Sequence, residues 1–420
     1  MKSSNSSAGK PQFRKQIKAA LAPARRRGIS FGAEARRATQ PAYELLDQAD
    51  KQMKSGSRKT VVDIGQTVLE EMVPALQFID DSHADVGEAI RWATHLLTEA
   101  AEQPLDAALQ KSYFKWCMKS VRGDRYEGWD TQDDLMAIAV RLADGEKQVS
   151  EIETYLDERI KEIGQKREGY SWKYYLECSV KQKIRLLHNE NRSAEAVALM
   201  EEYRHLRGVL EMLIESAWES GDIDRVEELA QNAIDTLGKD APGLVSGWLG
   251  WLTKTAEAQG DVGLQQERLK GLFYEKADLE NFHRLKKAVP EDQWPQVCDE
   301  ITEELKTRRR SFYILPEIYE AENRMDDLLE WLKNNPDFGA LERFGPHFKK
   351  SHTNVMFELY EQLIRKSLAN NTGRKYYRRM VRTLRDLSAS GFNEQIPPLV
   401  EDLKEQYYNR PALLDEFGKM

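Results

Sequence analysis

The sequence predicts an all-α fold in which helical hairpins follow one another along the chain. None of the 14 prolines lies between Pro104 and Pro242, and proline is excluded from helix interiors. Apolar residues recur at helical spacing, as in residues 210–218, where they follow the pattern i, i+3, i+4, i+7, i+8. No stretch shows the apolar–polar alternation between turn pairs that strands require. These three observations together indicate consecutive helices.

The hairpins are predicted from four breaks of similar composition, each a short polar turn with glycine or asparagine ahead of an acidic and apolar helix. The turn residues are Asn191, Gly221, Gly260 and Asn323. They lie 30, 39 and 63 residues apart, and the last interval is close to two repeats. A hairpin of about 30 to 45 residues is the repeat of tetratricopeptide-like arrays, so we expect such repeats, stacked into a curved solenoid. At about 20 residues per helix with its turn, the length predicts roughly 18 to 22 helices.

Three regions are expected along the chain. Residues 1–41 form a basic N-terminal arm with a short amphipathic helix, and residues 42–165 form a helical block. Residues 166–420 form the helical-repeat region, and its boundary falls within residues 163–172, where two glycines bracket a charged run. The helix in the arm has one apolar face, made by Phe13, Ile17, Ala20 and Leu21. The last residues, 407–420, are expected to end a helix and form a short capping tail.

Charge separates the arm from the rest of the chain. Residues 1–42 hold ten Lys or Arg and a single acid, Glu34, which gives a net charge of +9. Since the whole chain carries −8, the remainder carries −17. Such a segment suits nucleic acid, an acidic partner or the acidic body itself. The residues that would contact nucleic acid are Arg25, Arg26, Arg27, Arg36 and Arg37. The alternative is that the arm docks on the body or only aids solubility.

A second basic segment, residues 373–387, is expected to form one helix with two distinct faces. Its apolar residues share the inward face. The opposite face carries the residues we predict to bind an acidic partner, namely Arg374, Arg378, Arg382 and Arg385. Such a basic stripe is usually a solvated face, but helical arrays also use one to bind acidic peptides or nucleic acid.

An acidic stretch, residues 123–135, contains five carboxylates around Trp129. Its spacing does not match a calcium loop, and no histidine motif completes a metal cage. We therefore expect a loop that closes at Gly123, a core position for Trp129, and a helix capped by Asp130. Asp133 and Asp134 would then lie in the first turn, beside the positive end of the helix dipole. A divalent-metal enzyme built on these carboxylates is a third hypothesis, testable as a metal-dependent shift in melting temperature.

No catalytic residue set, metal site or cofactor is predicted. The seven histidines are scattered, and the common nucleophile, phosphate-loop and dinucleotide motifs are absent. The three cysteines, Cys117, Cys178 and Cys298, form no close pair, which excludes a zinc knuckle and a disulfide framework. Cys117 and Cys178 lie in apolar helical contexts and are expected in the core. No apolar run is long enough to cross a bilayer, so we expect a soluble protein. The lack of paired cysteines favours a reducing cytoplasm.

Several stretches together resemble the C-terminal helical region of bacterial SWIM zinc-finger proteins. They include "RYEGWDTQDDLMAIAVRLA" (125–143), "DLENFHRLKKAVPEDQWPQVCDEI" (278–301), "KYYRRMVRTLRDL" (375–387) and "RPALLDEF" (410–417). The resemblance spans nearly the whole chain from Phe13, which argues against a cleaved transit peptide. The finger that defines the family needs a CxC pair, which this sequence lacks. The resemblance therefore implies a free-standing tetratricopeptide-like region that holds other proteins.

The sequence as a whole predicts a non-enzymatic scaffold or adaptor. Its partner would be a protein or peptide bound on the surface of the stacked hairpins. The alternative is a nucleic-acid-binding protein that uses the basic arm together with the 374–385 stripe.

Overall fold

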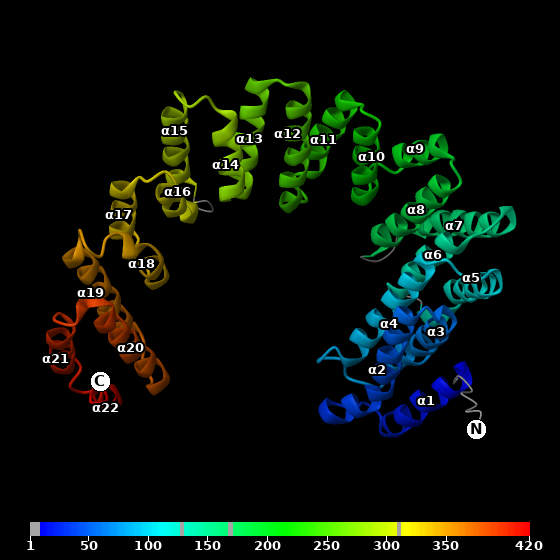
Figure 1. The fold of residues 1–420 in the computed structure, drawn as a ribbon, viewed down its shortest axis with the longest axis horizontal. Coiled ribbons are helices and arrows are strands. Elements are labelled where there is room, and N and C mark those ends of the chain that lie inside the picture. The colour runs from blue at the N-terminus through cyan, green and yellow to red at the C-terminus, as the bar shows by residue number, and fades with distance from the viewer. Residues whose placement is uncertain (1–8, 127–129, 167–170, 309–311) are drawn as a thin grey trace. The chain divides into compact units, whose positions relative to one another are not determined.

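The computed structural model describes residues 9–126, 130–166, 171–308 and 312–420, which are helical almost throughout (Figure 1). These ranges contain 22 α-helices and no strand, only an isolated bridge between Ser30 and Ile79. The all-α prediction and the expected number of helices are confirmed. None of the described helices combines the length and the apolar character needed to cross a membrane.

The chain divides into two compact units, Met1–Arg225 and Val226–Met420. The helices of the first unit are α1 (Lys10–Arg27), α2 (Gly32–Ser55), α3 (Arg58–Ala75), α4 (Asp85–Glu102), α5 (Ala107–Val121), α6 (Thr131–Leu142), α7 (Glu146–Lys166), α8 (Trp172–Asn189), α9 (Ser193–Glu202) and α10 (Arg207–Glu219). The division falls near the start of α11 (Ile223–Leu237). The second unit continues with α12 (Val245–Gln259), α13 (Val262–Lys276), α14 (Leu279–Ala288), α15 (Trp294–Thr307), α16 (Leu315–Ala321), α17 (Met325–Asn334), α18 (Phe338–Phe344), α19 (Thr353–Asn370), α20 (Arg374–Leu387), α21 (Ile396–Gln406) and α22 (Pro411–Phe417).

The first unit is built in two layers. Helices α2, α4, α6, α8 and α10 form one row in which each packs against the next (Figure 1). Helices α1, α3, α5, α7 and α9 lie behind them, each packed on the helix that follows it in the chain. Each hairpin thus buries its apolar face against its own partner and against the next hairpin, as in a repeat array.

The four predicted turns are helix ends. Asn191, Gly221, Gly260 and Asn323 all adopt positive φ, between 55° and 77°. Glycine and asparagine tolerate this left-handed conformation best, because other side chains clash with the backbone there. After the first, second and fourth of these residues, the next N–H donates to a carbonyl five residues back, at 2.7–2.9 Å. This bond closes the last turn of α8, α10 and α16. The 63-residue interval contains four helices, α13 to α16, which is two hairpins, as its length predicted.

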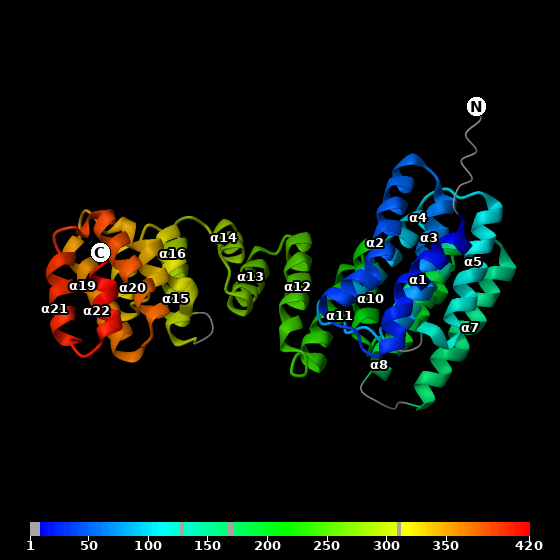
Figure 2. The same ribbon diagram turned by 90° about the horizontal axis from the view of Figure 1, so that it is seen from below.

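The basic N-terminal segment belongs to the core of the first unit. Helix α1 packs against α2 and α3 (Figure 2). Its residues Phe13, Ile17, Leu21 and Ala24 are buried. Ala20, expected on the same face, is only half-buried. The helix also runs through Pro23 to Arg27, and the basic residues of its last turn suit the negative end of the helix dipole. Residue 41, the expected end of the arm, lies inside α2. The expected boundary at residues 163–172 covers the end of α7 and the start of α8, and its residues 167–170 lie outside the described residues.

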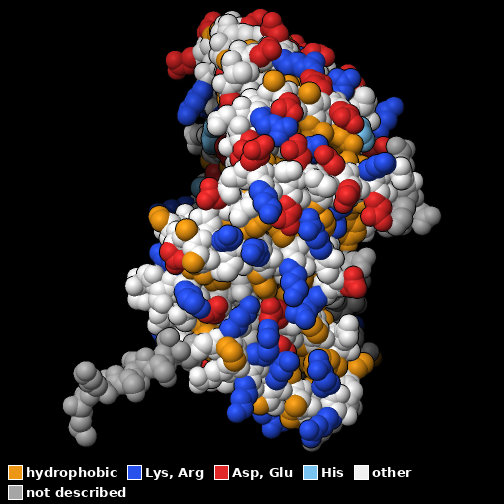
Figure 3. Space-filling model, turned by 90° about the vertical axis from the view of Figure 1, so that its right-hand side faces the viewer, with side chains coloured by type: hydrophobic (Ala, Val, Ile, Leu, Met, Phe, Trp, Pro, Cys, Tyr) orange, Lys and Arg blue, Asp and Glu red, His pale blue; other side chains and the backbone are white. Residues whose placement is uncertain are grey.

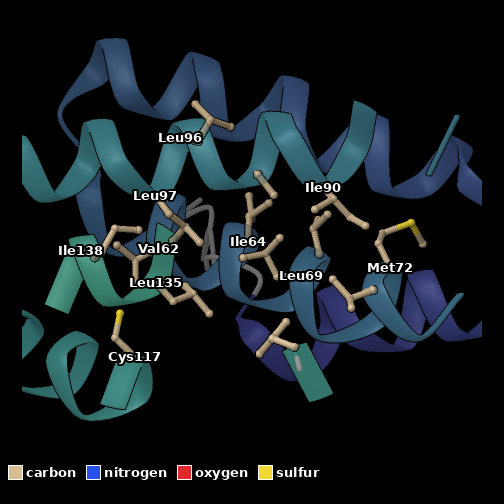
Figure 4. Packing of buried hydrophobic residues seen from close by; sticks show 14 of the residues in the cluster. Val62, Ile64, Leu69, Met72, Ile90, Leu96, Leu97, Cys117, Leu135 and Ile138 are labelled. Atoms are coloured by element: carbon tan, nitrogen blue, oxygen red, sulfur yellow. The ribbon is translucent and has the colours of Figure 1, made fainter. Parts of the chain in front are cut away.

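Helix α3 is the most deeply enclosed helix of the described first unit. It packs on α1, α2 and α4, and nearly every residue from Val61 to Leu69 is buried. Figure 4 shows the packing, with Val62, Ile64 and Leu69 among side chains from the neighbouring helices. Gly65 permits the closest approach, since a Cβ atom there would lie 2.7 Å from Cγ of Leu97. Helix α4 can therefore lie directly on the backbone of α3.

Gly65→Ala is expected to lower the free energy of unfolding by about 1–3 kcal/mol, because the added methyl group overpacks the α3–α4 contact. Leu97→Ala alone should cost about 2–5 kcal/mol through the cavity that it leaves. In the double variant the methyl group enters that cavity. The double variant should therefore lose less free energy of unfolding than the two single variants together. A double-mutant cycle by urea unfolding measures the coupling. Additive losses would contradict the contact, and Gly250→Ala, whose Cβ meets open space, serves as the control.

The second unit has its own hydrophobic core, to which the helices from α13 to α22 contribute. At its C-terminal end, α19, α20, α21 and α22 lie close together (Figure 2). Helix α20 packs directly on α22, which places the end of the chain beside the second basic segment.

Candidate binding surfaces

A groove of about 700 Å³ crosses α4, α6 and α8 in the row of even-numbered helices. Ile138 and Val140 of α6 contribute an apolar floor and are buried. Arg141, Arg185 and Asn189 stand at its edge and are exposed. We call this space, with these five residues at its floor and edge, the α4–α6–α8 groove.

The two arginines of this groove form only weak, long contacts with other residues of the chain. Arg141 lies 3.6 Å from the carboxylate of Glu102, and both side chains are about half exposed. Arg185 donates to the amide oxygen of Gln182 at 3.4 Å. Because such exposed pairs contribute little to stability, both guanidinium groups can turn toward a bound carboxylate at small cost.

Helix α20 has the two faces that its sequence predicts. Its buried residues are Tyr377, Met380, Val381, Leu384 and Leu387. The predicted partner-binding residues, Arg374, Arg378, Arg382 and Arg385, are all exposed. We call these four the arginine stripe.

Three residues of the arginine stripe contact the chain's own C-terminus. Arg374 lies 2.9 Å from Asp415, and Arg378 donates to Glu416 at 3.4 Å. Arg385 donates to the carbonyl oxygen of Lys419. The predicted capping tail is thus an acidic helix, α22, whose carboxylates lie on the stripe.

The cations around α22 also tune its carboxyl groups. Lys419, followed by Arg378, holds the pKa of the Glu416 carboxyl below its usual value. Lys419 and Arg374 lower the pKa of Asp415 in the same way. Both carboxylates therefore stay ionised at neutral pH and favour the docked position of α22.

The predicted nucleic-acid-binding arginines lie around the α1–α2 connection. Arg25 stacks on the ring of Phe78, with its guanidinium carbon 5.1 Å from the ring centroid, and Arg26 is exposed. Arg36 lies 3.8 Å from Asp85, and Arg37 donates to the carbonyl of Ala33. The side chain of Arg27 lies outside the described residues. Figure 3 shows the side of the molecule that lies on the right in Figure 1. Lys and Arg side chains gather in its lower part, at the height of α1 and α2 in Figure 1.

The acidic stretch forms a helix start, but not with the expected cap. Asp130 precedes α6 without a capping hydrogen bond, and its carboxylate accepts from the hydroxyl of Tyr174 at 3.1 Å. The prediction of an Asp130 cap was wrong, because its backbone is already helical and does not aim the side chain at the free N–H groups. Asp133 and Asp134 lie in the first turn as expected, and burial raises both pKa values. Trp129 and Glu127 lie outside the described residues.

The described residues contain no group of three or more His, Cys, Asp or Glu side chains placed to hold a metal ion. Cys117, Cys178 and Cys298 are free thiols. Burial raises the pKa of all three, to about 11 for Cys178, so these thiols stay protonated at neutral pH. Cys117 is buried as predicted, whereas Cys178 is only half-buried.

Comparison with known proteins identifies no relative by sequence. No protein-family model matches the chain, and no curated protein matches it. Among solved structures, it is similar to a circular tandem repeat protein with novel repeat topology and enhanced subunit contact surfaces. The two share 16% sequence identity at a TM-score of 0.21, with 97% of this chain and 91% of that chain covered. Such a TM-score does not establish a common backbone arrangement, so the all-α fold rests on the helices themselves.

Proposed function

We propose that the chain is a non-enzymatic, cytoplasmic scaffold or adaptor that binds a protein or peptide partner on its helical-hairpin surface. The α4–α6–α8 groove carries this proposal. It combines an apolar floor with two exposed guanidinium groups and an amide, beside a single carboxylate, that of Glu190. An extended peptide that presents an acidic residue beside an apolar one fits that chemistry, because guanidinium groups bind carboxylates in a bidentate fork. The resemblance to the helical region of SWIM zinc-finger proteins favours the same task.

The groove is tested by reversing its charge. The variant Arg141→Glu/Arg185→Glu and the wild-type chain are used to capture proteins from a lysate of the source organism, which are then identified by mass spectrometry. We expect a defined set of proteins to bind the wild type and to be lost from the variant. Arg91→Glu/Arg207→Glu, which changes two exposed arginines of the first unit outside the groove, should retain that set. The same proteins captured by both variants would contradict the groove as the binding site.

Nucleic-acid binding is a second candidate, favoured by the exposed arginines around the α1–α2 connection, Arg25, Arg26, Arg36 and Arg37. It predicts captured material that is lost after nuclease treatment and at moderate salt, since phosphate contacts weaken steeply as salt rises. Removal of the first 40 residues is not a suitable test, because it removes buried core residues of α1. The sharper variant is Arg25→Glu/Arg26→Glu/Arg36→Glu/Arg37→Glu. Binding that depends on these arginines and not on the groove would favour this candidate.

A further inference from the structure

A second cavity of the first unit, of about 580 Å³, lies between α1, α3 and α5 and the 3₁₀ turn Asp124–Tyr126. It belongs to different helices from the α4–α6–α8 groove and plays no part in the proposed partner binding. Its size is that of a site for a small molecule, within the usual range of about 300–1,000 Å³. We name it the α1–α3–α5 pocket.

One wall of the pocket is a row of cations on α1. Lys10, Arg14 and Lys18 are four residues apart and therefore lie along one face of the helix. Glu70 and Glu71 of α3 face them, with Arg14 Nε at 3.2 Å and Lys18 Nζ at 3.7 Å from Glu71. The indole N–H of Trp116 also donates to Glu70, at 2.7 Å. This wall is thus a fixed network that holds the pocket open.

The opposite wall supplies hydrogen-bond donors that take no part in this network. Lys119 and Arg125 are exposed, and neither forms an ion pair with another described residue. The hydroxyl of Tyr126 lines the pocket and is buried, with no hydrogen-bond partner among the described residues. Burial raises the pKa of this hydroxyl to about 12, and the neighbouring guanidinium of Arg125 offsets that shift only in part. A buried polar group without a partner is costly, so its presence here points to an absent ligand.

The net charge of the pocket lining indicates the chemical class of its ligand. The lining holds five cationic side chains and three carboxylates, which leaves an excess of two positive charges when all are ionised. Burial also lowers the pKa of Lys10 to about 8, although its amino group donates to Gln66 at 2.7 Å. The lining therefore carries a net positive charge, and a nearby bound anion would raise the pKa of Lys10 again.

We propose that the α1–α3–α5 pocket binds a phosphate-bearing small molecule. The phosphate oxygens would accept hydrogen bonds from Lys119, Arg125 and Tyr126, with the hydroxyl of Ser120 on the same wall. A phosphate dianion matches the two excess charges, and its oxygens can accept from more donors than a carboxylate offers. A small molecule fits better than a nucleic-acid strand, because Glu70, Glu71 and Asp124 border the pocket and repel a continuous phosphate backbone.

Isothermal titration calorimetry of the full chain with inorganic phosphate and with pyrophosphate tests the site, with acetate as the monoanionic control. We expect binding of both phosphates, and an affinity at least about tenfold weaker in Lys119→Glu/Arg125→Glu. Lys111→Glu/Lys115→Glu changes two exposed lysines of the same helix outside the pocket and should bind as the wild type does. Tyr126→Phe keeps the packing and removes only the hydroxyl, so a weaker affinity in this variant reports the buried donor. At pH 8, binding should take up protons, since Lys10 regains its charge.

Three results would overturn the proposal. The first is no heat of binding for either phosphate with the wild-type chain. The second is an equal loss of affinity in the Lys111→Glu/Lys115→Glu control, which would show a general attraction for anions. The third is a single-stranded oligonucleotide that displaces pyrophosphate and binds more tightly through Lys119 and Arg125, which would assign these side chains to a nucleic-acid surface.

Discussion

Phe13→Ala is expected to lower the free energy of unfolding of the first unit by about 3–5 kcal/mol, the usual loss for a buried aromatic side chain. Phe13 is 1% exposed and Ile17 is 0% exposed, and both belong to the same core cluster as the residues of α3. The loss should therefore reach beyond α1, because α1 covers α3 on the side away from α4. Hydrogen exchange followed by mass spectrometry measures it as faster exchange in the peptides of α1, α2 and α3.

The control for Phe13→Ala is Lys15→Ala, which changes an exposed residue of the same helix. It should leave the exchange of α2 and α3 unchanged. If Phe13→Ala behaves like Lys15→Ala, or accelerates exchange in α1 alone, residues 10–27 would be a detachable arm and not part of the core.

The local features of this fold were predictable from the sequence, whereas the packing of α1 was not. Asn191, Gly221, Gly260 and Asn323 mark helix ends by their own backbone preferences, so a short window around each is sufficient. The core role of Phe13 depends on residues about 50 positions away in α3, which no local pattern encodes. The basic composition left open whether this segment binds nucleic acid or docks on the acidic body. The structure shows docking, because the acids that receive these cations, Glu70 and Glu71, lie on α3.

In the candidate sites too, local features were predictable from the sequence, whereas contacts between distant residues were not. The helical period correctly assigned the two faces of α20, because that assignment needs only the helix itself. It could not reveal that Asp415 and Glu416 return to the arginine stripe across about 40 residues of chain. The α4–α6–α8 groove and the α1–α3–α5 pocket each draw residues from three helices. The local sequence feature that could have indicated the pocket is the spacing i, i+4, i+8 of Lys10, Arg14 and Lys18, which places them on one face of a helix.

Phe417→Ala is expected to release α22 from the second unit and uncover the arginine stripe. Helix α22 has only seven residues and is too short to persist alone, so its position depends on tertiary contacts. Leu413 is 0% exposed and Phe417 is 2% exposed, and they are its apolar anchors in the core. Loss of the aromatic ring should cost about 3–5 kcal/mol, and the exposed ion pair that remains between Arg374 and Asp415 contributes only about 0–1 kcal/mol. Hydrogen exchange in residues 407–420 should therefore become much faster in this variant.

The same variant tests the predicted role of the stripe. Once α22 has left, Arg374, Arg378 and Arg385 lose their contacts with Asp415, Glu416 and Lys419, so a fluorescent glutamate-rich peptide should bind more tightly than to the wild type. Anisotropy at low salt measures the gain, and adding Arg374→Ala/Arg378→Ala to Phe417→Ala should remove it. Asp415→Asn, which weakens the exposed ion pairs with Arg374 and Lys419 and keeps the apolar anchors, should change neither exchange nor peptide binding appreciably. Fast exchange of α22 without any gain in peptide affinity would show that the stripe serves only to hold the end of the chain.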